Sequence, residues 1–178
     1  MKKIFTAILL ILCITVTSTA VSAEDEDGQP FVSVQVDTET FDLRTPCGVT
    51  EHELESVLKH ELKGMAKYYL AAEEKYGVNA VFLASVSALE SGWGRYCFRE
   101  NNIFGYGRNT FDSYEECIDF VASKISKNYL DEDGRYYSGT TIDAVNRYYN
   151  GREAWAETVK SIFERMLEKV DLKRINNI

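Results

Sequence analysis

The sequence has few of the residues that hold metal ions. It contains only two histidines, His52 and His60, which lie eight residues apart, and it has no CxxC or HExxH spacing. Zinc sites in proteins are built from cysteine and histidine ligands at such spacings. We therefore expect both histidines to be solvated helix residues, and we expect no metal ion and no other cofactor.

Basic residues are also scarce. The 20 Lys and Arg residues are outnumbered by 28 Asp and Glu residues, which gives a formal net charge of −8. Residues 24–46 are especially acidic, with seven acids and one base. Because nucleic acids and anionic lipid surfaces attract proteins through clustered Lys and Arg, this composition argues against both kinds of partner.

The sequence contains only four cysteines. Cys13 lies in an apolar N-terminal stretch, and the rest of the chain contains Cys47, Cys97 and Cys117. If that stretch is cleaved off on export, three cysteines remain, and an odd number leaves at least one thiol free even where disulfides form. The sequence does not say which two of the last three cysteines pair, if any do.

The first 23 residues have the pattern of a secretory signal peptide. Lys2 and Lys3 precede an apolar stretch over residues 4–16, and the small residues Val21-Ser22-Ala23 match a cleavage site. We expect cleavage after Ala23 and a secreted protein without membrane contact. An uncleaved membrane anchor is the alternative, and no other segment is long and apolar enough to span a bilayer.

The remaining chain divides into two parts. Residues 24–46 are expected to be an acidic, mostly flexible leader, with one short strand possible in "FVSVQV" by its alternation. Residues 47–178 form the folded domain, which we expect to be monomeric.

From Thr50 onward the sequence is typical of a helical domain. Thr50 with Glu53 and Ser113 with Glu116 are capping boxes that mark helix starts. The glycines between the third and fourth helices favour a loop, with at most a small β element near residues 103–112. The expected fold is therefore mainly α, with a very small β-hairpin lobe. The expected helices cover about residues 50–61, 63–77, 80–91, 113–129, 140–149 and 153–170.

The helix over residues 80–91 ends with an unusual acid. Its residues Val81 to Leu89 are apolar or small on every side, which is typical of a helix buried all round. Glu90 follows at the C-terminal end, where an apolar wall and the helix dipole both raise the pKa of a carboxyl group. A carboxylic acid that stays protonated near neutral pH can act as a general acid. The alternative is a solvated glutamate at a helix end.

Aromatic and amide side chains crowd the glycine-rich stretch after Glu90. Flat rings stack on sugar faces and line ligand clefts, and the amides of Asn101 and Asn102 can bind hydroxyl or acetamido groups. The alternative is core aromatics and turn asparagines. The aromatic residues are Trp93, Tyr96, Phe98, Phe104, Tyr106 and Phe111.

These motifs resemble a known family. "ALESGWG" followed by "NNIFGYG" is similar to the bacterial glucosaminidases, endo-β-N-acetylglucosaminidases that cut peptidoglycan and resemble lysozyme in fold. "FDSYEECIDFVASKI" and "VNRYYNGREAWAETVKSIFERM" resemble later segments of the family, in the same order. The resemblance covers roughly residues 47–170 and implies a lysozyme-like domain acting on peptidoglycan glycan strands outside the cell or in the cell wall.

The resemblance also implies roles for individual residues. Glu90 matches the catalytic glutamate, the general acid on the glycosidic oxygen. Tyr148 matches the active-site tyrosine, and Tyr149 is the fallback because two tyrosines are adjacent. The cleft-lining segment corresponds to Asn101, Asn102, Phe104, Gly105 and Tyr106, and Trp93 matches the aromatic residue of the glutamate motif, as packing or binding.

The chain departs from the family where a second carboxylate is expected. Only residues 106–112 stand between "NNIFG" and "SYEE", and Asp112 is the one acid among them. Either Asp112 is the second catalytic group, or the 2-acetamido group of the sugar assists, with Tyr148 positioning it. Retention and inversion of the anomeric centre both stay open.

Two other functions fit the same residues. A lytic transglycosylase or muramidase of lysozyme-like fold also relies on one glutamate. A secreted cell-wall-binding module that has lost turnover would explain the missing second carboxylate.

Overall fold

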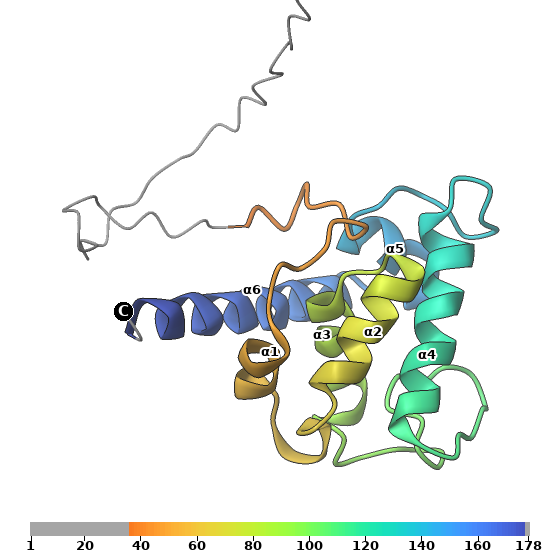
Figure 1. Ribbon diagram of the computed structural model, residues 1–178. Coiled ribbons are helices and arrows are strands. Elements are labelled where there is room, and N and C mark those ends of the chain that lie inside the picture. The colour runs from red at the N-terminus through yellow and green to blue at the C-terminus, as the bar shows by residue number, and fades with distance from the viewer. Residues whose placement is uncertain (1–35, 177–178) are drawn as a thin grey trace, which may run out of the picture. The chain divides into compact units, whose positions relative to one another are not determined.

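The computed structural model of the chain describes residues 36–176, which contain six α-helices, two short helical turns and no strand (Figure 1). Within this part of the chain, no helix combines the length and apolar character that a bilayer crossing requires. The elements are α1 (Glu51–Val57), the 3-10 turn η1 (His60–Leu62), α2 (Ala66–Tyr76), α3 (Ala80–Ser91), α4 (Tyr114–Ile125), the π-helical turn η2 (Ser126–Leu130), α5 (Ile142–Tyr149) and α6 (Glu153–Asn176).

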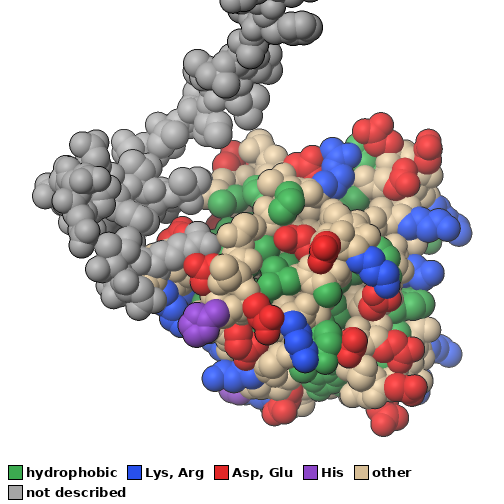
Figure 2. Space-filling view, in the orientation of Figure 1, with side chains coloured by type: hydrophobic (Ala, Val, Ile, Leu, Met, Phe, Trp, Pro, Cys, Tyr) green, Lys and Arg blue, Asp and Glu red, His purple; other side chains and the backbone are tan. Residues whose placement is uncertain are grey.

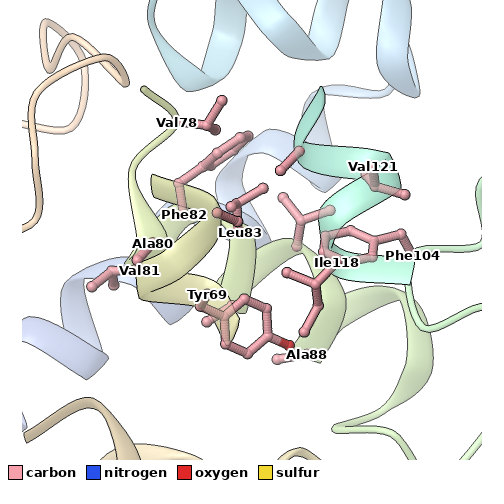
Figure 3. Packing of buried hydrophobic residues seen from close by; sticks show 14 of the residues in the cluster. Tyr69, Val78, Ala80, Val81, Phe82, Leu83, Ala88, Phe104, Ile118 and Val121 are labelled. Carbon is pink, nitrogen blue, oxygen red and sulfur yellow. The ribbon is translucent and has the colours of Figure 1, made fainter. Parts of the chain in front are cut away.

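α3 is the buried centre of the domain, as its sequence predicts. Every residue from Ala80 to Ala88 is buried, and α2 and α6 pack against the helix. Figure 3 shows Phe82 and Leu83 of α3 among side chains of α2 and α4, including Tyr69 and Ile118. Because the helix has no polar face, burial on all sides fixes its position and therefore the position of Glu90 at its end.

The expected helix starts are confirmed. The Thr50 hydroxyl accepts from the Glu53 N–H while the Glu53 carboxylate accepts from the Thr50 N–H, which completes a capping box. Asn79 caps α3, and the Ser113 hydroxyl accepts from the Glu116 N–H at the start of α4. The first helix is shorter than expected, because the backbone becomes extended after Val57 before the turn η1 begins.

The expected β-hairpin near residues 103–112 is wrong. The loop between α3 and α4 contains turns, and no strand pairing is found anywhere in residues 36–176. Asn102 supplies hydrogen bonds to the backbone of this loop, because its amide donates to the carbonyls of Tyr106 and Asn109 at 3.2 and 3.0 Å. Left-handed backbone at Gly105 and Gly107 breaks the extended run that a hairpin needs.

Residues 36–46 pack on the helical domain and do not behave as a flexible leader. The compact unit begins at Val36. Leu43 is fully buried, its N–H donates to the Thr140 carbonyl and its carbonyl accepts from the Asn79 N–H, both at 2.9 Å. The Phe41 ring lies 5.4 Å from that of Phe163 on α6. The proposed signal peptide, the leader over 24–35 and most of "FVSVQV" lie outside the described residues.

The three cysteines beyond the N-terminal segment are free thiols. Cys117 is buried, and Cys47 and Cys97 are half-buried. Burial raises the pKa of Cys47 to about 11 and that of Cys117 to about 12, so both thiols stay protonated at neutral pH.

The outer surface carries both signs of charge. Figure 2 shows one face on which acidic and basic side chains are interspersed. Such a mixed face does not concentrate positive charge for a polyanion.

Candidate active site

Glu90 lies in an apolar setting with one strong hydrogen-bond donor. The side chain is half-buried at the end of α3, and the indole N–H of Trp155 on α6 donates to Glu90 Oε1 at 2.7 Å. Burial raises the pKa of the Glu90 carboxyl, and the Trp155 hydrogen bond opposes part of that rise. Desolvation is the largest cause of the rise, which is the direction that the apolar sequence before Glu90 predicts.

Gly105 lies against the other oxygen of the same carboxyl group. A Cβ atom at position 105 would lie 3.5 Å from Glu90 Oε2, and the backbone there is left-handed, with φ at +59°. Glycine adopts this conformation without steric cost, and any larger residue here would place its side chain against Oε2. Phe104 just before it is buried in the core and helps to anchor the loop.

The two asparagines of the loop hold its backbone. The amide of Asn101 donates to the Phe111 carbonyl at 2.8 Å. Asn102 is buried, and its Oδ1 accepts from the Tyr106 N–H at 2.9 Å while its amide bonds two loop carbonyls. Asn102 thus fixes the turn that contains Gly105, and Asn101 ties the loop to Phe111, so both have the turn-forming role weighed above.

Of the two adjacent tyrosines, Tyr149 lies beside Glu90. Its ring is 5.2 Å from the Trp155 ring, and its hydroxyl donates to the Phe104 carbonyl at 3.4 Å. Burial, and next the nearby Glu90 charge, raise the pKa of Tyr149 well above its ordinary value. Tyr148 is 54% exposed, and its ring contact is with Tyr136 at 5.9 Å. The fallback tyrosine is therefore the one that the fold brings to the acid.

Tyr149 belongs to a continuous aromatic cluster. Its ring lies 6.4 Å from that of Tyr106 and 5.9 Å from that of Tyr129. Several rings of the cluster are partly exposed, so their faces can contact a ligand beside Glu90. The members are Tyr106, Phe111, Phe120, Tyr129, Tyr136, Tyr148, Tyr149 and Trp155.

Trp155 is the site residue that the sequence did not single out. Its position in the apolar stripe of its helix predicts a core residue and gives no sign of a catalytic role. One signal was available: a buried indole N–H needs a hydrogen-bond acceptor.

Two other predicted site residues lie in different surroundings. Asp112 is exposed, its backbone N–H donates to Glu116 Oε2 at 2.7 Å, and no hydrogen bond or ion pair of the described chain joins its carboxyl to Glu90. Trp93 is half-buried with Lys59 Nζ 4.8 Å from its ring centroid. Within residues 36–176, no three His, Cys, Asp or Glu side chains gather as metal ligands.

The domain resembles solved structures of an autolysin. Staphylococcus aureus Autolysin E in complex with the muropeptide NAM-L-ALA-D-iGLU superposes with a TM-score of 0.64, at 18% identity, over 84% of each chain. A catalytic mutant of Autolysin E with the disaccharide NAG-NAM gives a TM-score of 0.61, at 19% identity, over 84% of this chain and 85% of that chain. These likenesses confirm the lysozyme-like helical fold.

Sequence comparison identifies the family. Two proteins from different strains of Streptococcus pneumoniae, each named "Putative endo-beta-N-acetylglucosaminidase", are 32% identical over 106 residues, which is 53% of this chain. The aligned region spans only 16% and 15% of those longer relatives. Residues 66–168, more than half of the chain, match the family Glucosaminidase, described as mannosyl-glycoprotein endo-beta-N-acetylglucosaminidase. The chain therefore belongs to the glucosaminidase family.

Proposed function

We propose that this chain is a secreted endo-β-N-acetylglucosaminidase that hydrolyses the glycan strands of bacterial peptidoglycan. The observation that carries the proposal is the Glu90 carboxyl, whose pKa burial raises and which lies between the Trp155 indole and Gly105. The likeness to an autolysin with NAG-NAM and muropeptide ligands supports the substrate class. The same reasoning supports action outside the cell or in the cell wall.

Glu90 is the proposed general acid. When protonated, its carboxyl donates a proton to the oxygen of the scissile glycosidic bond as that bond breaks, and positive charge develops at C1 of the sugar. The carboxylate that results can then accept a proton from the incoming water. The open face beside Gly105 gives the glycosidic oxygen room to reach Oε2.

The second catalytic role is proposed to belong to the substrate. The Asp112 side chain is exposed, without the apolar surroundings that Glu90 has, and we assign it no catalytic role. The carbonyl oxygen of the 2-acetamido group can instead attack C1, and water then opens the resulting ring with net retention at C1. We expect Asp112→Asn to keep turnover within a factor of a few.

Tyr149, not Tyr148, is expected to position the acetamido group. Tyr149→Phe removes the hydroxyl that lies in the buried site and should lower kcat about 100-fold, the usual effect of losing one preorganised hydrogen-bond donor. Tyr148→Phe is the matched control, because its ring is 54% exposed and should keep kcat within about two-fold. Steady-state rates of both variants on one peptidoglycan substrate test the assignment, and a larger loss in Tyr148→Phe would reverse it.

Identification of the new chain ends tests the function. Peptidoglycan is digested with residues 24–178, the products are reduced with borohydride, and the terminal sugar is identified by mass spectrometry. Reduced N-acetylglucosamine supports the proposal. Reduced muramic acid or an anhydro end would make the protein a muramidase or a lytic transglycosylase.

The same experiment also tests whether the protein only binds the wall and whether it cuts glycoprotein glycans. Wall binding without any new ends would make the protein a binding module. A mannose-containing glycoprotein, the substrate class in the family description, is included as a parallel substrate. Release of its glycan would extend the activity beyond the wall.

A further inference from the structure

A cavity is lined by residues of α6 and by Trp93, which follows the end of α3. It has a volume of about 220 Å³ and lies between α6 and the segment after α1. The Trp93 ring and the buried Met166 side chain supply its apolar surface. Its lining residues are Val57, Lys59, Trp93, Thr158, Ile162, Arg165, Met166 and Lys169.

The charges around this basic cavity are all positive. Lys59, Arg165 and Lys169 line it, and no Asp or Glu does. None of the three cations forms a salt bridge within the described residues, although Lys75 and Lys160 elsewhere do. In a chain of net charge −8, three unneutralised cations around one cavity repel one another and favour an anion between them.

Part of the cavity lining lies on the helix that also contacts Glu90. Trp155, Thr158, Ile162, Arg165 and Lys169 are spaced three or four residues apart, so they form one stripe along α6. Trp155 begins the stripe and donates to Glu90. Arg165 lies ten residues further, about 15 Å along the helix axis.

Trp93 lines the cavity and is also close to Glu90 in the sequence. It follows Glu90 by three residues, in the turn that ends α3. Its backbone is left-handed, with φ at +67°, a conformation that non-glycine residues rarely adopt. Lys59 Nζ lies 4.8 Å from the ring centroid, so the indole already holds one of the three cations at the cavity.

We propose that the basic cavity binds a free carboxylate of the peptide stem attached to the glycan strand. This inference rests on the proposed function and adds a second recognition point to it. Arg165 and Lys169 pair with the carboxylate, and Trp93 packs against the apolar part of the stem residue. A cavity of this size holds one short side chain with its carboxylate, and it is too small for an extended polyanion.

The test measures binding without turnover. In the Glu90→Gln background, the affinity for a soluble disaccharide-peptide with free carboxylates is compared between the parent and Arg165→Gln/Lys169→Gln. The affinities of the same two proteins are also compared for the amidated disaccharide-peptide and for the disaccharide without peptide. The matched control is Lys67→Gln/Lys127→Gln, which removes two exposed lysines that do not line the cavity.

Arg165→Gln/Lys169→Gln should bind the free-carboxylate ligand about ten-fold more weakly, because it loses two exposed ion pairs to that carboxylate. It should bind the amidated ligand and the bare disaccharide like the parent, and the control should match the parent on all three ligands. Equal affinities for all ligands, no binding by the parent, or an equal loss on the bare disaccharide would each overturn the proposal.

One further arm uses poly(glycerol phosphate) as the ligand. Binding of this polymer that depends on Arg165 and Lys169, without such dependence for the peptide, would assign the cavity to a phosphate polymer and overturn the carboxylate proposal. Because none of these arms needs cleavage, a wild-type protein that fails to cut peptidoglycan would sink the proposed function alone.

Discussion

Replacing Glu90 with glutamine is expected to lower kcat on peptidoglycan about 1,000-fold, within the range that general acid catalysis contributes. Glutamine has nearly the same shape but donates no acidic proton to the glycosidic oxygen. Its side-chain oxygen can still accept from the Trp155 indole. Reducing-end assays on the wild type and the variant measure the loss, and a decrease of less than ten-fold would show that another group supplies the proton.

The same substitution should not destabilise the fold at neutral pH. Burial raises the pKa of Glu90 in the native state, so ionisation is easier in the unfolded chain, and the native state loses stability as pH rises through this range. Glutamine removes that effect. We therefore expect Tm of the variant to equal or exceed that of the wild type at pH 7, with the advantage shrinking toward pH 4. A lower Tm at pH 7 would point to structural damage as the reason for lost activity.

Replacing Phe82 with alanine is expected to lower the free energy of unfolding by about 3–5 kcal/mol, the usual cost of deleting a buried phenyl ring. Phe82 is fully buried at the centre of α3, where Figure 3 shows it among core side chains. The cavity left behind cannot collapse easily, because helices surround α3 on several sides. Urea unfolding followed by circular dichroism measures the change.

Phe98→Ala is the matched control for this loss. The Phe98 side chain is 94% exposed, so the same deletion removes almost no buried surface. The control should change the free energy of unfolding by no more than about 0.5 kcal/mol. Similar losses in both variants would mean that Phe82 is not part of a packed core.

The helices and the acid could be predicted because their signals are local. A capping box, a left-handed glycine or an all-apolar helix is defined within a few consecutive residues. Thr50 and Ser113 therefore mark helix starts in the structure as they do in the sequence. Glu90 follows from the same reasoning, since its burial is set by the helix that carries it.

The features that were missed depend on contacts between distant segments. Trp155 meets Glu90 across 65 positions of the chain, and no spacing within α6 reveals that contact. The choice between Tyr148 and Tyr149 depends on which side of α5 faces the loop that holds Phe104. The sequence of residues 36–46 is polar and predicts a flexible segment. In the structure the Leu43 side chain is buried, and its backbone bonds those of Asn79 and Thr140.

The pKa of Glu90 is the quantity to measure first. The carboxyl is labelled with ¹³C and titrated by NMR in the free enzyme, with Glu90→Gln to assign the signal, and kcat/KM is measured over the same pH range. We predict a pKa above the ordinary glutamate value of about 4.3, matched by loss of kcat/KM as pH rises through it. A carboxyl that titrates at or below the ordinary value, with kcat/KM still high above it, would contradict the assignment of Glu90 as the general acid.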